Sequence, residues 1–121
     1  MEKNFIIYDK RVVDLKVSAS GGPDVILKFS GGTTQKLELE HKWNNYVLHY
    51  HHKSPAWKDA WLYAGEEWNF DKIKKVFSPY IDHYLCNIPK VFLSTDKSTG
   101  EKKAYEVDWM KLSYVEIEVK D

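Results

Sequence analysis

The sequence predicts an α+β domain in which an antiparallel sheet of about six strands is covered on one face by two helices. Three observations support this fold class: alternating apolar and polar residues at both ends of the chain, a Gly-Gly pair between two alternating runs, and two helical patterns in the middle. The expected order is β-β-β-(β)-α-α-β-β-β, and residues 1–121 are expected to form one domain.

The N-terminal part has the alternation of half-buried strands over residues 11–18, 24–30 and 35–40. In the first of these runs, Val13, Leu15 and Val17 share one face. The Gly31-Gly32 pair between the second and third runs predicts a β-hairpin, because hairpin turns need residues that tolerate positive φ. Glu38 and Glu40 alternate with leucines in the third run, so we expect both carboxylates on a solvated strand face.

Residues 43–52 fit two patterns. Trp43, Tyr46, Val47 and Tyr50 recur with a helical period, whereas alternate positions from Tyr46 to His52 recur as in a strand. The aromatic and β-branched content favours a strand, and the Asn44-Asn45 pair near its start is typical of a turn.

Two helices are predicted next. The first begins at Ser54-Pro55, because serine caps helices and proline suits the first helical position. Its expected apolar stripe comprises Trp57, Ala60, Trp61 and Ala64. The second begins near Asn69 and kinks or restarts at Ser78-Pro79. Strands are expected to resume over residues 90–95, 103–109 and 115–120.

Composition excludes several classes of protein. The 18 basic and 18 acidic residues cancel, and Arg11 is the single arginine, so we expect no specific nucleic-acid recognition. No apolar run approaches the ~18 residues of a membrane span, and the N-terminus lacks the features of a signal peptide. With Cys86 as the one cysteine, no intrachain disulfide can form. We therefore expect a cytoplasmic protein that does not bind membranes.

Few residues indicate metal or catalytic chemistry. On a strand, His49 and His51 would face the same side and could chelate one metal ion, with His83 as a further candidate ligand. A His-x-His pair alone is a weak signal, so we expect no metal and no cofactor. Cys86 lies near a predicted helix C-terminus, where the helix dipole disfavours a thiolate. No nucleotide-binding or nucleophile motif is present, and no enzymatic activity is expected.

Aromatic residues give the strongest indication of function. Twelve of the 18 lie between Trp43 and Phe92, more than two short helices need to cover one face of a sheet. Tyrosine and tryptophan are enriched where proteins bind partners. We therefore expect a partner-binding surface on residues 41–61 and the adjoining turn at 66–68. Its expected residues are Trp43, Tyr46, His49, Tyr50, His51 and Trp68.

Two functional hypotheses follow. The favoured one is a non-enzymatic protein that binds and inhibits or neutralises a macromolecular partner, as immunity proteins and phage anti-defence proteins do. We expect this partner to be a protein. The competing one is a small-ligand-binding or small enzyme domain for a nucleotide-like, planar ligand. Its pocket would be lined by Tyr46, His49, Tyr50, His51 and Trp57. The sequence leaves open whether the chain forms a homodimer.

Overall fold

A mixed sheet of nine strands is the main element of this protein, which a computed structural model describes over residues 4–18, 21–81 and 87–120. The strands are β1 (Ile6–Ile7), β2 (Lys10–Val17), β3 (Val25–Phe29), β4 (Thr34–Glu40), β5 (Trp61–Ala64), β6 (Val91–Thr95), β7 (Lys102–Asp108), β8 (Ser113–Ile117) and β9 (Val119–Lys120). The described helices are α1 (Asn45–Leu48), α2 (Phe70–Phe77) and three 3-10 turns, η1 (His51–Lys53), η2 (Pro55–Trp57) and η3 (Ser78–Tyr80).

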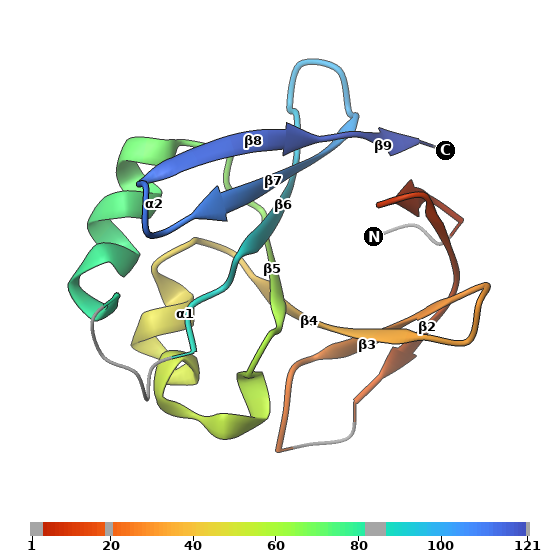
Figure 1. Ribbon diagram of the computed structural model, residues 1–121, viewed down its shortest axis with the longest axis horizontal. Coiled ribbons are helices and arrows are strands. Elements are labelled where there is room, and N and C mark those ends of the chain that lie inside the picture. Colours follow the sequence, from red (N-terminus) through yellow and green to blue (C-terminus); the bar gives the residue numbers. More distant parts are fainter. Residues whose placement is uncertain (1–3, 19–20, 82–86, 121) are drawn as a thin grey trace.

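The sheet curls into a nearly closed barrel. Its order is β8-β7-β6-β5-β4-β3-β2-β1-β9, with β5 parallel to β4 and β6 and all other neighbours antiparallel. Only Glu118 separates β8 from β9, so one C-terminal segment pairs with β7 at one edge and with β1 at the other. Figure 1 shows the strands as a ring, with both helices outside it on one side.

Two hydrophobic cores lie on opposite faces of the central strands. The first fills the barrel, and its fully buried members include Phe5, Ile7, Leu27, Leu37 and Leu93. The second lies between the outer face of the sheet and the helices, and it includes Trp43, Tyr46, Leu62, Ile73, Phe77 and Phe92. Strand β5 contributes to both, because its alternate side chains point to opposite faces.

The prediction of a six-strand sheet covered by two helices is wrong, and the reason lies in residues 54–64. Ser54-Pro55 begins only the short turn η2, and Asp59 then takes a left-handed conformation (φ 60°) that ends it. The chain continues as β5, whose side chains are alternately half-buried and buried. The apolar spacing that predicted a helix is here the pattern of a strand covered on both faces. Residues 43–52 are also not a strand, since they contain α1 and most of η1.

Several predicted elements are confirmed. The β3–β4 hairpin turns at Gly31-Gly32, where Gly32 has φ 93°, and α2 begins after Asn69, whose side chain accepts a hydrogen bond from the Lys72 amide (3.2 Å). The expected apolar face of β2 is confirmed only at Leu15, which packs against the core inside the barrel. A bulge between Val12 and Asp14 places Val12 in this core instead of Val13, and Val17 at the end of the strand is 79% exposed. None of the described helices is long and apolar enough to cross a membrane.

Candidate functional site

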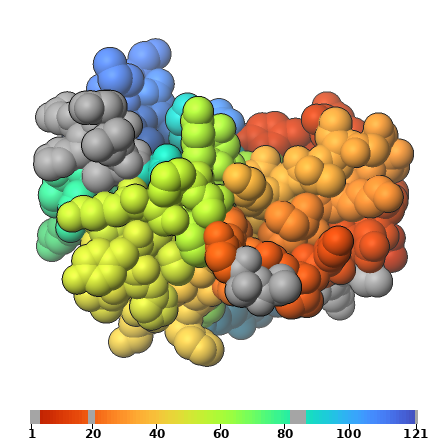
Figure 2. All heavy atoms as spheres, turned by 90° about the horizontal axis from the view of Figure 1, so that it is seen from below, coloured from red at the N-terminus to blue at the C-terminus, as the bar shows by residue number. Residues whose placement is uncertain are grey.

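Residues 41–58, the basic segment, connect β4 to β5 outside the barrel and fold as α1, η1 and η2. The segment contains three lysines and four histidines but no aspartate or glutamate. In Figure 2 its yellow and yellow-green side chains gather at the left of the face seen from below. The segment therefore forms a locally basic surface on a chain whose total charge is zero.

A sharp bend at Tyr50 gives the basic segment its shape. Helix α1 ends at Leu48 with His49 as its C-cap, and Tyr50 takes a left-handed conformation (φ 59°, ψ 21°) before η1 begins at His51. Non-glycine residues adopt this region rarely, and a bulky side chain there is strained. The bend brings the rings of His49 and His51 to one side, with their centroids 5.6 Å apart.

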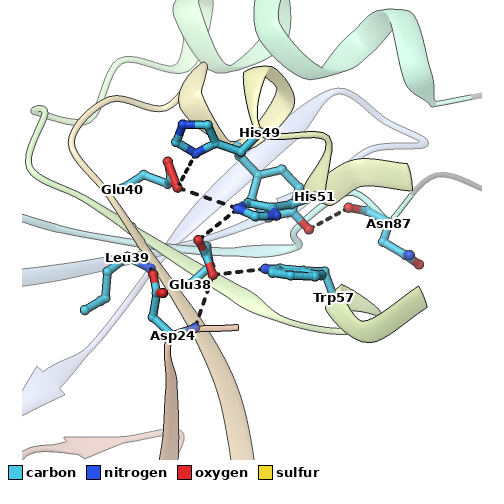
Figure 3. Close-up of polar contacts among 9 residues, drawn as sticks. Asp24, Glu38, Leu39, Glu40, His49, His51, Trp57 and Asn87 are labelled. Carbon is cyan, nitrogen blue, oxygen red and sulfur yellow. Dashed lines mark hydrogen bonds and ion pairs between the residues drawn. The ribbon is translucent and has the colours of Figure 1, made fainter. Parts of the chain in front are cut away.

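Both rings face two carboxylates at the end of β4 (Figure 3). His49 Nδ1 lies 2.9 Å from Glu40 Oε1. His51 Nε2 lies 3.0 Å from Glu38 Oε2 and 3.7 Å from Glu40 Oε1. The side chains of Glu38 and Glu40 are only 4–5% exposed, so the basic segment covers them. The expectation that these glutamates lie on a solvated strand face is therefore wrong.

Glu38 is held by two further donors. The Trp57 indole N–H donates to its Oε1 at 3.0 Å, and the Asp24 backbone N–H donates to the same oxygen at 3.2 Å. Burial raises the pKa of Glu38 to about 8, although both hydrogen bonds favour its ionised form. Burial also lowers the pKa of His51, and the nearby Glu40 carboxylate partly offsets this decrease. The result is a pair of covered acids beside a largely covered His51, while the His49 side chain stays 55% exposed.

Aromatic rings surround His51. Trp57 stacks on it, with centroids 4.2 Å apart and planes 15° apart, and Tyr46 meets it edge-on at 5.6 Å. The Tyr50 ring instead lies roughly parallel to His52, with centroids 6.4 Å apart. Trp57 therefore occupies one face of the His51 ring.

The expected surface residues divide into buried and exposed ones. Trp43 and Tyr46 are fully buried, and Trp68 is half-buried and stacked on Tyr105 at 4.2 Å. The expected place of Trp43 and Tyr46 on the surface is wrong, because the outer face of the sheet carries a second core that contains both rings. Trp68 keeps part of its surface exposed and packs against the same core. Tyr50 is 69% exposed and the His49 side chain is 55% exposed, as the sequence led us to expect.

Sequence reasoning named His49 and His51 as candidate site residues but did not name Glu38 and Glu40. One signal could have indicated the glutamates: an acidic Glu-x-Glu pair directly precedes a long stretch without acidic residues. Among the described residues, Glu40, His49 and His51 place one potential ligand atom each within 4.8 Å of one another. His83, the third histidine proposed as a metal ligand, lies outside the described residues.

Comparison with known proteins gives no match to a family model and no significant match to a curated protein or a solved structure. Function must therefore be inferred from the chemistry of the site.

Proposed function

We propose that this protein is a non-enzymatic, cytoplasmic binding protein that inhibits or neutralises another protein, and that it binds this partner through the basic segment. The observation that carries the proposal is that Tyr50 and Leu48 are both exposed (69% and 63%) within a segment that has no acidic residue. Large apolar side chains at the centre of a patch with a charged rim are typical of protein interfaces.

The conformation of Tyr50 supports a binding role. Its left-handed backbone costs of order 1 kcal/mol, and a glycine would avoid that cost. Its ring gains little from burial, because most of it faces solvent. Strain of this kind at an exposed aromatic residue is more easily explained by an interaction outside the chain than by stability of the fold.

The charge of the segment indicates the chemistry of the partner. Lys42, Lys53 and Lys58 are all exposed, so the surface complements an acidic one. The chain has one arginine, Arg11, and it lies on β2 outside this segment. A nucleic acid is a poorer candidate, because base and phosphate recognition favour arginine. We therefore infer a protein partner with an acidic surface that offers a recess for Tyr50 and Leu48.

The experiment compares wild type with the Leu48→Ser/Tyr50→Ser double variant as baits in cells of the native host, followed by calorimetry with the captured protein. We expect one acidic protein to bind wild type directly, and the double variant to bind it at least about tenfold more weakly. Met110→Ser is the matched control, because Met110 is 91% exposed and lies outside the segment. Equal binding by the double variant, or equal loss in the control, contradicts the proposal.

A further inference from the structure

We propose that Glu40, His49 and His51 bind a divalent transition-metal ion, of which Zn²⁺ is the best match, and that this ion ties the basic segment to β4. The site differs from the partner surface in position, because its donor atoms point inward to the end of the sheet (Figure 3). It also does not depend on the proposed function, since metal binding can be measured without any partner.

The distances suit a small ion after slight adjustment. Zinc binds imidazole nitrogens and carboxylate oxygens at about 2.0–2.2 Å, so neighbouring ligand atoms in a tetrahedral site lie about 3.4 Å apart. Glu40 Oε1 is 2.9 Å from His49 Nδ1 and 3.7 Å from His51 Nε2, and all three atoms lie within 4.8 Å of one another. Small side-chain rotations bring such atoms to ligand positions.

Glu38 can supply a fourth ligand. Its Oε2 lies 3.0 Å from His51 Nε2, close to the spacing of two ligands on one zinc ion. Two histidines and two glutamates would then close the coordination sphere. A closed sphere of four protein ligands is the arrangement of structural zinc, which stabilises a fold and leaves no position for a substrate.

The charge of the cluster favours a cation. Two covered carboxyl groups, Glu38 and Glu40, both lie near Nε2 of His51, and Asp24 lies next to Glu38 through its backbone hydrogen bond. Within the described part of the chain, histidines are the only ion-pair partners of Glu38 and Glu40. Buried carboxylates are costly unless a positive charge compensates them, and a divalent ion compensates two at once.

The surroundings hold the ligands in place. Trp57 both stacks on His51 and donates its indole N–H to Glu38 Oε1, so that one side chain orients two ligands. The Asp24 N–H donates to Glu38 as well, and the Asp24 carboxylate accepts from the Leu39 N–H at 3.2 Å, which fixes this end of β4. Hydrogen bonds of this kind around metal ligands commonly raise metal affinity by about 10–100-fold.

Calorimetric titration of the untagged, chelator-treated chain with Zn²⁺ tests the site directly. We expect one ion per chain with a Kd of about 1 μM or tighter. With Co²⁺ as the spectroscopic probe, we expect the strong visible bands of a four-coordinate site. His49→Gln should weaken Zn²⁺ binding at least about tenfold. His49 is the safest variant for folding, because its side chain is 55% exposed.

His41→Gln is the matched control, since His41 is an exposed histidine in the same segment that is not part of the ligand cluster. It should bind Zn²⁺ as wild type does. A second measurement is amide hydrogen exchange, in which Zn²⁺ should slow exchange across residues 45–53 in wild type and not in His49→Gln. The proposal is overturned by no binding at 100-fold excess Zn²⁺, by unchanged affinity in His49→Gln, or by an equal loss in His41→Gln.

Discussion

Trp43 and Tyr50 belong to the same segment but lie in opposite environments. The Trp43 ring is fully buried, meets Phe92 and Trp68 edge-on, and donates its indole N–H to the Glu67 carbonyl oxygen (3.0 Å). Tyr50 is mostly solvated. Residue type alone does not distinguish them, because both are large aromatic residues with a polar group.

The two residues should therefore respond differently to truncation. We expect Trp43→Ala to lower the free energy of unfolding by about 3–5 kcal/mol, since it removes a whole ring from a core. Tyr50→Ala should change it by less than about 0.5 kcal/mol. Urea unfolding followed by circular dichroism measures both. Comparable losses in the two variants would mean that Tyr50 contributes to packing, and the partner surface would lose its central residue.

Glu66 stabilises the turn that leads to α2. Its carboxylate accepts a hydrogen bond from the Trp43 backbone N–H (2.8 Å) and forms an ion pair with Lys72. Burial raises the pKa of Glu66. These partners and the nearby Lys42 lower it by more than burial raises it, so the net pKa lies below the ordinary value of 4.5. The folded state therefore favours ionised Glu66 more than the unfolded state does.

This shift predicts how stability depends on pH. A lowered pKa gives stability that is fully present above pH 4.5 and is lost as the pH falls through the folded-state pKa. At pH 7, Glu66→Gln should lower the free energy of unfolding by about 1–2 kcal/mol. The difference from wild type should shrink between about pH 5 and pH 3. Urea unfolding across this range is the measurement, with Glu67→Gln on the exposed neighbour as control. If the difference in the free energy of unfolding between wild type and Glu66→Gln stays constant across this pH range, the ionised Glu66 carboxylate is not its cause.

At the scale of elements, the two helices differ in how they begin. The Asn69 side chain accepts a hydrogen bond from the Lys72 amide and caps α2, whereas Asn44 precedes α1 without a side-chain cap bond. We expect Asn69→Ala to cost about 1 kcal/mol and Asn44→Ala less than about 0.5 kcal/mol. Chemical unfolding of the two variants tests the difference. Equal effects would show that Asn69 acts by something other than its cap.

The elements that the sequence predicted well are those with local signals. The β3–β4 hairpin follows from Gly31-Gly32, and α2 follows from Asn69 and the apolar residues at helical spacing after it. Strand β5 has no such signal, because its pairing with β4 and β6 is parallel and non-local. Ser54-Pro55 resembles a helix start in isolation, and only tertiary contacts limit it to η2.

The candidate site was also predictable only where it depends on local sequence signals. The spacing of His49 and His51 placed them on one side, which is where they lie, but the cause is the bend at Tyr50 and not a strand. Glu38 and Glu40 fit a solvated strand face by alternation alone. Their burial depends on the basic segment crossing over β4, and no local pattern encodes that contact.

At the scale of the whole molecule, the pairing of β9 with β1 is the seam at which the C-terminal segment meets the N-terminal edge of the sheet. Over the described residues, strand β9 pairs with β1, through Ile6 with Lys120 and Ile7 with Val119, and this pairing brings the sheet close to a closed barrel. Val119 also packs against the core inside the barrel. Only two residue pairs join the strands here, so the seam should open more easily than the rest of the sheet.

Placing a charge at the seam tests this closure. Val119→Asp sets a carboxylate against the barrel core, and it should speed amide exchange of Ile6 and Ile7 at least about tenfold, which corresponds to about 1.4 kcal/mol of local stability. Val17→Asp makes the same change at a valine that is 79% exposed, and it should leave exchange at β1 nearly unchanged. Exchange measured by NMR in both variants decides the question. If Val119→Asp speeds exchange uniformly across the sheet, the seam opens only when the whole barrel unfolds, and β9 is an integral part of one cooperative unit.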